Sequence, residues 1–198
     1  MSLVLYIYAC NRPAQTGEGV FELEQNRIHL VVNWIVDIVV MIVLACYTVY
    51  AFGGRAAVNG HSMEPALASG DVVLLNRLAY DLGKPDRFDI IAFRQGDSAV
   101  SIKRVIGLPG ETVQIRDQAV YINGERLETE GGLEAVSIAG AAEFPVELSE
   151  NEYFVLGDNR DSSEDSRFSG TGNVKREQIL GKVWLRLEPF SEFGLIHS

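Results

Sequence analysis

The feature that most constrains this 198-residue chain is an apolar run from Leu30 to Phe52. As an α-helix, its 23 residues would extend about 34 Å, more than the roughly 30 Å thickness of a bilayer's hydrocarbon core. Trp34 lies toward one end of the run, and Tyr47 and Tyr50 lie toward the other, where aromatic side chains favour the membrane interface. We therefore predict one transmembrane helix over residues 30–52 that anchors the chain in a lipid bilayer.

Two other interpretations of this run fit less well. A buried helix of a soluble domain would carry a polar stripe, whereas the clear polar positions here are Asn33, Asp37 and Thr48. A cleaved secretory signal would have a shorter apolar core followed by small residues at a cleavage site. Asn33 and Asp37 lie one helical turn apart, so this face could lie near the headgroups, contact a partner helix, or carry a protonated aspartate.

The helix divides the chain into a tail over residues 1–29 and a domain over residues 53–198. Arg12 and Arg27 precede the predicted span and Arg55 closely follows it. Because basic residues favour the cytoplasmic side, we expect a cytoplasmic tail and an extracytoplasmic domain, on the outer face of the cell membrane. The apolar stretch 2–10 is too short to span a bilayer, so we expect an interfacial segment or a frayed tail there.

After residue 58 the pattern changes to short runs of branched apolar residues between turn signals. The predicted strands are residues 71–75, 88–93, 98–106, 112–115, 119–122, 153–156 and 182–187. Residues 116–118 lie between two of them in a probable hairpin, and Asn123-Gly124 is a strong turn dipeptide that we expect to close it. Residues 128–150 are weakly periodic and predict at most one strand. Frequent short strands without regular helices predict a mainly β, compact antiparallel or mixed fold.

Charge and cysteine usage exclude several classes of function. The net charge of −10 disfavours nucleic-acid binding, which needs a basic patch. The two cysteines, Cys10 and Cys46, lie before the predicted domain, so a disulfide framework or a zinc–thiolate site within it is excluded. The three histidines are too scattered for a convincing metal site, and we expect neither a metal nor a cofactor.

A lysine and a serine suggest the chemistry. Lys103 lies in the apolar stretch VSIKRVIGL (100–108), where burial would lower the pKa of its amine and allow it to act as a base. Ser62 lies on a turn before Pro65 and is a natural partner nucleophile. Alternatively, Ser62 is an ordinary turn serine and Lys103 extends its amine to solvent. Strand alternation around Lys103 does not decide which face is buried. His61 is a poor base for Ser62, because adjacent extended side chains point apart.

The segment GDNRDSSEDSR (157–167) is dense in charged and hydrogen-bonding groups. By itself it could be a solvated acidic loop. It could also support a site, because a serine hydroxyl can orient a neutral lysine amine and carboxylate–arginine pairs can fix a loop.

Three segments in order carry a family resemblance: GHSMEPAL (60–67), IKRVIGLPGE (102–111) and GDNRDSSEDSR (157–167). They resemble the conserved boxes of bacterial type I signal peptidases, the leader peptidases, and the chain looks most like the compact single-span forms. GDVVL (70–74) and the upstream anchor fit as well. The resemblance covers roughly residues 35–189 and implies the β fold of that family.

By position, the resemblance implies that Ser62 is the nucleophile, Lys103 the general base and Ser163 the serine that hydrogen-bonds the lysine. It implies structural pairs between Arg104 and Asp158 and between Asp165 and Arg167. It places Val58, Leu67 and Ile102 along the pockets for small substrate side chains, and Gly157 and Asn159 in the supporting loop.

One position departs from part of the family. Some members have a hydroxyl residue two before the nucleophile that aids the oxyanion hole, whereas this chain has Gly60. Gly60 lets a backbone approach closely, and the amide of Ser62 would then carry more of the oxyanion contact.

The resemblance implies a membrane-bound serine endopeptidase with a Ser–Lys dyad, which removes signal peptides from exported preproteins after small residues of the Ala-x-Ala type. A self-cleaving repressor-type Ser–Lys protease shares the core chemistry, but it would need a DNA-binding domain where this chain has its apolar run. A non-catalytic anchored β-domain is the other alternative, and it would have no use for Ser62, Lys103 and Ser163 together.

Overall fold

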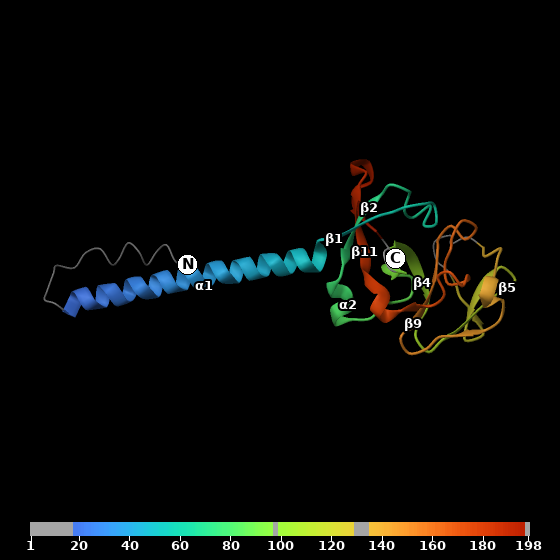
Figure 1. Cartoon of the computed structure of the whole chain (residues 1–198), viewed down its shortest axis with the longest axis horizontal. Coiled ribbons are helices and arrows are strands. Elements are labelled where there is room, and N and C mark those ends of the chain that lie inside the picture. The colour runs from blue at the N-terminus through green and yellow to red at the C-terminus, as the bar shows by residue number, and fades with distance from the viewer. Residues whose placement is uncertain (1–17, 97–98, 129–134, 197–198) are drawn as a thin grey trace. The chain divides into compact units, whose positions relative to one another are not determined.

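The computed structural model describes residues 18–96, 99–128 and 135–196 (Figure 1). The predictions for residues 2–10 and for Arg12 lie outside these residues. The chain divides into two units, Met1–Tyr47 and Thr48–Ser198. The first holds most of a long helix, and the second holds its last turn and a β-rich fold.

Helix α1 (Glu18–Phe52) contains the predicted span but begins well before it. The residues added at its start include glutamates, leucine, glutamine and arginine, which have good helix propensity. The apolar part, His29–Phe52, is long enough to cross a membrane, and none of its most apolar window is buried within the described structure. That exposure is inconsistent with the core helix of a soluble domain and consistent with a single-pass membrane anchor.

Among the described residues, eight strands form the larger sheet, and every pairing in it is antiparallel. The sheet order is β1 (Gly54–Ala57), β2 (Val72–Asn76), β11 (Ile179–Glu188), β3 (Ile90–Gln95), β4 (Ala99–Gly107), β9 (Glu152–Leu156) and β10 (Val174–Lys175), with β12 (Gly194–Leu195) paired to β11. The mainly β fold predicted from the sequence is therefore confirmed, and of the antiparallel and mixed arrangements left open, the larger sheet is antiparallel.

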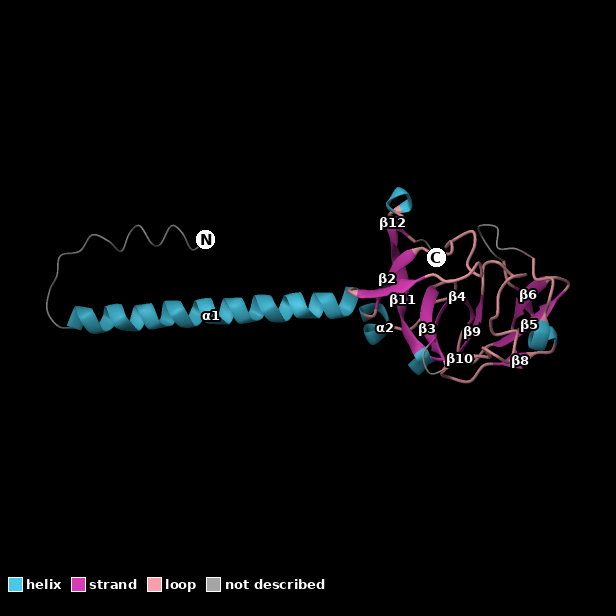
Figure 2. Ribbon diagram, turned by 45° about the horizontal axis from the view of Figure 1, so that its top comes forward, coloured by secondary structure: helices cyan, strands magenta, loops and turns pink. Residues whose placement is uncertain are grey.

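The described residues also form a four-stranded antiparallel sheet in the order β7 (Glu125–Arg126), β6 (Ala119–Ile122), β5 (Thr112–Arg116) and β8 (Val146–Glu147). It lies at the opposite end of the β-rich unit from β1 and β2 (Figures 1 and 2). The predicted hairpin is present, but Asp117-Gln118 closes it, whereas Asn123-Gly124 turns β6 into β7. All four of these turn residues have positive φ, as tight two-residue hairpin loops require.

Several local elements differ from the predictions, among them β1, which was not expected. The short helix α2 (Leu78–Leu82) was not expected, because five residues are too few to show a helical period. The 3₁₀ turns are η1 (Gly140–Glu143), η2 (Arg176–Gln178) and η3 (Phe190–Glu192). The strand predicted from Phe88 begins at Ile90 instead, because Phe88 has a φ of 72° and leaves the extended conformation.

Strand β4 lies in the middle of the core. Ile102 packs in a cluster with the residues that follow β1, Val105 in a second cluster with β3 and β9, and Ile106 in a third with the smaller sheet. All six residues from Ile102 to Gly107 are buried. A strand covered on both faces has no alternating pattern, which explains why alternation could not decide the environment of Lys103.

Candidate active site

The loop between β1 and β2 carries Ser62, and hydrogen bonds join its two ends. Val58 N donates to Asp71 O at 2.8 Å, and Gly70 N donates to Val58 O at 2.9 Å. Within the loop Met63 and Leu67 are 1% and 0% exposed, so two apolar side chains anchor the segment in the core beside the half-buried Ser62. The burial of its neighbours holds the Ser62 hydroxyl at the edge of the core.

Strand β4 brings Lys103 to this hydroxyl. Lys103 is 6% exposed, and its Nζ lies 2.7 Å from Ser62 Oγ in a hydrogen bond that joins residues 41 positions apart. Register places Lys103 opposite Ile91 on β3. The two residues that the sequence singled out therefore meet, with the geometry of a nucleophile and its base.

Burial lowers the pKa of the Lys103 amine, because the ammonium form loses its hydration in the core. The carboxylates of Asp165 and Glu164 act in the opposite direction and raise it, while the guanidinium of Arg167 lowers it. The net direction is downward, so the neutral amine, the form that can accept a proton, is favoured relative to an exposed lysine.

Both predicted ion pairs are present, and in each the carboxylate lies in the loop that follows β9. Arg104 Nε donates to Asp158 Oδ1 at 2.8 Å and Arg104 Nη2 to Asp158 Oδ2 at 2.7 Å. Asp165 and Arg167 pair at 2.8 Å with both side chains 0% exposed. Each carboxylate is satisfied by a guanidinium, so neither is available as a close counter-ion for Lys103.

The same loop also contacts Ser62 through its backbone. Asn159 N donates to Ser62 O at 3.1 Å, and Gly157 N donates to Asp165 Oδ2 at 3.1 Å. A Cβ on Gly157 would lie 2.2 Å from Ser163 Oγ and 2.5 Å from Ser62 O. Only a glycine allows the loop to approach Ser62 this closely.

Ser163 lies at this contact, but the structure does not show its expected hydrogen bond to Lys103. Its Oγ is buried and has no hydrogen-bond partner. The expected role therefore stays a prediction. A buried, unpaired hydroxyl is costly, which favours a partner in the working enzyme.

The three residues expected to line substrate pockets lie together in the core. Val58, Leu67 and Ile102 belong to one core cluster and are 4%, 0% and 7% exposed. Gly60 has a φ of +86° with no atom within 4 Å of the position a Cβ would take, and its N–H donates to Ser69 Oγ at 3.2 Å. The three apolar side chains are thus packed in the core, while the position that a Cβ would take at Gly60 is open.

One contact of the loop that carries Ser62 was not predicted. Arg186 on β11 lies 3.1 Å from Asp71 Oδ2, and its Nη2 donates to the carbonyl of Ala66. No local pattern links residues this far apart in sequence.

His61, as expected, is not placed as a base for Ser62. It is exposed, and its Nδ1 lies 2.7 Å from Glu64 Oε1 in a hydrogen bond. No cluster of potential metal ligands occurs among the described residues.

Comparison with known proteins identifies the family. Residues 31–188 match the family model described as signal peptidase, peptidase S26, which is more than half of the chain. The chain belongs to this signal peptidase family. The resemblance stated from the three sequence segments is thereby confirmed.

Individual relatives agree with this assignment. The chain is 36% identical to signal peptidase I of Bacillus caldolyticus over 171 residues, covering 79% of this chain and 90% of the relative. It is 34% identical to signal peptidase I S of Bacillus subtilis over 170 residues, covering 82% and 91%. A crystal structure of a signal peptidase I from Enterococcus faecalis matches at 39% identity and a TM-score of 0.43, covering 50% of this chain and 97% of that one.

Proposed function

We propose that Ser62 and Lys103 form the catalytic dyad with which the chain cleaves signal peptides from exported preproteins. As a member of its family, the chain is a serine peptidase with signal peptidase I activity. The observation that carries the dyad is the 2.7 Å contact between Lys103 Nζ and Ser62 Oγ, made by a buried amine whose pKa is lowered.

In the first half of the reaction, the neutral amine of Lys103 accepts the proton of the Ser62 hydroxyl. Ser62 Oγ then bonds to the scissile carbonyl carbon, and the carbonyl oxygen takes up negative charge near the backbone amide of Ser62. When the tetrahedral intermediate collapses, the ammonium of Lys103 gives its proton to the leaving amine. The mature protein departs and the signal peptide stays as an ester on Ser62.

In the second half, water replaces the leaving amine. Lys103, neutral again, accepts a proton from the water as its oxygen bonds to the ester carbon. The C–O bond to Ser62 breaks, and the proton returns to Ser62 Oγ. No cofactor is needed, because a lysine with a lowered pKa performs both proton transfers.

The substrate is proposed to bind as an added strand. In the described residues, β9 pairs with β4 only from Arg104 onward, so one edge of residues 99–103 carries no partner strand. The outer edge of β1 is likewise unpaired. A preprotein lying along such an edge would hydrogen-bond through its backbone and place its −1 and −3 side chains over Val58, Leu67 and Ile102. Small residues, as in Ala-x-Ala, fit this apolar floor.

The dyad is tested with the purified full-length chain and a precursor whose signal peptide ends in Ala-x-Ala. Ser62→Ala removes only the nucleophilic oxygen, so we expect precursor cleavage on a gel to fall by at least about 10⁴-fold with unchanged circular dichroism. Near wild-type processing by a folded Ser62→Ala variant would exclude Ser62 as the nucleophile.

The specificity is tested separately with the wild-type chain. Precursors with Ala at −1 and −3 are compared with versions that carry Leu at one of these positions. We expect the bulky side chain to be rejected, because the pocket residues are packed in the core. Equal cleavage of all the precursors would exclude the small-residue pockets while leaving the dyad intact.

We also propose that residues 1–29 are cytoplasmic and that residues 53–198 lie outside the cell membrane. Arg27 before the span supports this orientation, and so does the need to meet preproteins where they emerge. Protease added to intact protoplasts should digest the β-rich domain. Protection of that domain together with loss of the tail would reverse the orientation.

A further inference from the structure

The apolar span of α1 carries an asparagine and an aspartate on one face. Asn33 and Asp37 lie one helical turn apart, and both are exposed in the described part of the chain. An exposed carboxylate in the hydrocarbon core is costly, and ionisable residues in membrane spans usually face a partner that pairs with them. This pair, which the dyad of Ser62 and Lys103 does not use, therefore indicates a binding surface inside the membrane.

The depth of Asp37 follows from where the span ends. The last turn of α1 packs on the β-rich fold, because Ala51 is 1% exposed and its carbonyl accepts a hydrogen bond from Arg77 N at 3.0 Å. The lipid-facing part of the helix thus ends near Tyr50, which is 57% exposed. Thirteen positions separate Tyr50 from Asp37, or about 20 Å along a helix. In a core about 30 Å thick, Asp37 lies in the half of the bilayer in which the span begins, about 10 Å from its surface.

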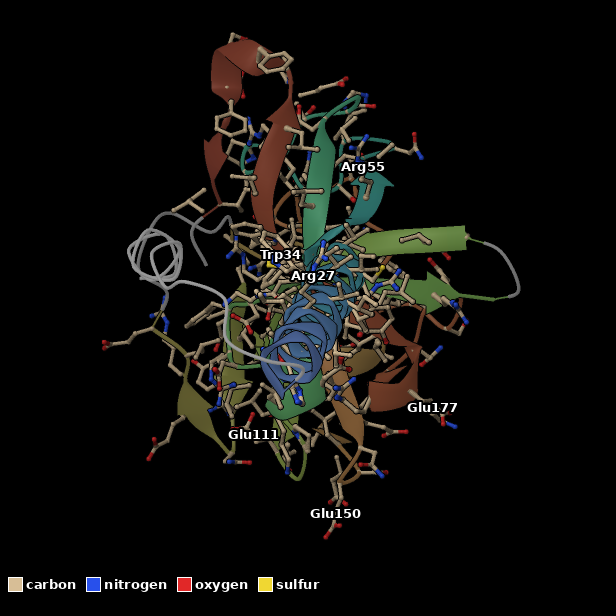
Figure 3. All side chains as sticks on the ribbon, turned by 90° about the vertical axis from the view of Figure 1, so that its left-hand side faces the viewer. Arg27, Trp34, Arg55, Glu111, Glu150 and Glu177 are labelled. Atoms are coloured by element: carbon tan, nitrogen blue, oxygen red, sulfur yellow. The ribbon has the colours of Figure 1, made fainter. Side chains whose placement is uncertain are left out.

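Among the described residues, none supplies a cation at this depth. Residues 30–52 contain no lysine or arginine. Arg27, labelled on α1 in Figure 3, lies ten positions before Asp37, or about 15 Å along the helix, which is too far for an ion pair. The aspartate side chain is also too short to reach the headgroups, as the long side chains of lysine and arginine can. A cation that pairs with Asp37 must therefore come from another molecule.

A signal peptide brings a cation to this depth. Its basic n-region precedes an apolar h-region of about 7–15 residues, which as a helix extends about 10–22 Å. That length is less than the thickness of the hydrocarbon core. When the C-terminal end of the h-region lies at the surface where the span ends, the n-region is drawn into the half of the bilayer that contains Asp37. A second copy of this chain would instead bring a second Asp37 to the same depth, where like charges repel.

We propose that Asp37 and Asn33 bind the basic n-region of the signal peptide inside the membrane. This inference rests on the proposed function and on the proposed orientation of the span. The carboxylate of Asp37 pairs with a lysine or arginine of the n-region, and the carboxamide oxygen of Asn33 accepts a hydrogen bond from the same cation. The contact holds the signal peptide alongside α1 while its other end is cleaved, so it favours precursors with a basic n-region.

Cleavage in vesicles tests the pairing. The full chain is reconstituted in phosphatidylcholine vesicles with precursors that differ only in the n-region, which carries two lysines, two glutamines or two glutamates. Asp37→Asn keeps the shape of the side chain and removes its charge, and Asp37→Lys reverses the charge. Each variant is compared with wild type on the same precursor, so differences in precursor insertion cancel. A short soluble peptide that contains only the cleavage site serves as the control substrate.

We expect Asp37→Asn to lower kcat/KM about tenfold on the lysine precursor, as for the loss of one complementary charge, and to leave the glutamine precursor unchanged. Asp37→Lys should lower the rate on the lysine precursor further and should cleave the glutamate precursor faster than wild type does. All three proteins should cleave the soluble peptide equally. An equal loss on every precursor, or no loss on the lysine precursor, would overturn the proposal. If wild type cleaved neither the precursors nor the peptide, the proposed function would fail and this inference with it.

Cross-linking tests the proximity independently. Ser62→Ala, Cys10→Ala and Cys46→Ala give a chain without cysteines that should not cleave the precursor, into which Asn33→Cys or Ile35→Cys is introduced. Position 35 is the matched control, because it lies at nearly the same depth on the opposite side of the helix. A precursor with one cysteine in its lysine-containing n-region should form a disulfide with position 33 and not with position 35. Equal cross-linking at both positions would overturn the assignment to this face. A disulfide between two chains through position 33, in place of the precursor, would also overturn it, because a second copy would then cover the face.

Discussion

Two lysines occupy the same cross-strand row of the larger sheet and have opposite surroundings. Lys103 on β4 and Lys182 on β11 both lie opposite Ile91 on β3. Lys182 pairs with Asp89 at 2.5 Å and keeps a side chain that is 31% exposed. Lys103 is 6% exposed and, among the described residues, its hydrogen-bond partner is the neutral hydroxyl of Ser62. A close carboxylate and water preserve an ammonium, whereas burial without either favours the free amine.

The strongest test of this difference between the two lysines is to replace each of them by arginine. Lys103→Arg should be as inactive as Lys103→Ala, at least about 10³-fold below wild type, because a guanidinium does not deprotonate in proteins. Lys182→Arg should stay within about threefold of wild type, since arginine can also pair with Asp89. Rates of precursor cleavage measure both. Substantial turnover by Lys103→Arg would mean that position 103 acts through its charge.

The next largest loss of activity is expected when the space between Gly157 and Ser62 is filled. Gly157→Ala would place a Cβ 2.5 Å from Ser62 O and 2.2 Å from Ser163 Oγ, so the loop and the nucleophile must move apart. We expect about a 10²-fold loss in kcat, the usual result of a displacement near 1 Å at a catalytic group. Gly194→Ala, where nothing lies within 4 Å of the new Cβ, is the control and should be nearly neutral. An unimpaired Gly157→Ala variant would show that the loop does not position Ser62.

The sequence predicted the strands well because their branched apolar runs end at clear turn residues, and the hairpin of β5 and β6 is an example. It could not predict β7, β10 or β12, which are two residues long and show no period. A lysine in an apolar stretch and a serine on a turn suggested the pairing of Ser62 with Lys103, and the family resemblance assigned their roles by position. The pattern between the two residues does not itself bring them together. The apolar neighbours of Lys103 suggested its burial, but strand alternation could not decide it, because β4 is covered on both faces.

Ser163 is expected to have a smaller effect than Gly157. If its hydroxyl orients the amine of Lys103, Ser163→Ala should lower kcat by about 10–100-fold, as with other supporting residues. It should also move the pH–rate profile, because the amine would lose a hydrogen-bond partner. Ser163→Thr, which retains a hydroxyl, should restore part of the rate. An Ala variant with wild-type kcat and an unchanged profile would limit Ser163 to packing against Gly157.

The smallest expected effect is on thermal stability. Replacing each lysine by methionine should change Tm in opposite directions. The pKa of Lys103 is lower in the folded chain than in the unfolded one, so the unfolded state binds more protons between the two values. Burying the ammonium therefore destabilises the fold fully at low pH, and this penalty disappears as the pH rises toward the ordinary lysine value. Lys103→Met should raise Tm by about 2–4 °C at pH 7, and the gain over wild type should shrink toward alkaline pH.

Lys182→Met should do the opposite and lower Tm, because it removes the cation that pairs with the buried carboxylate of Asp89. Thermal unfolding of wild type, Lys103→Met and Lys182→Met is measured in one detergent from neutral to alkaline pH. It gives the direction of both changes in Tm. In the same range the rate of the wild-type enzyme should rise with pH as the lysine loses its proton. If Lys103→Met were destabilising at pH 7 and the wild-type rate did not change with pH, burial would not be what makes Lys103 a base.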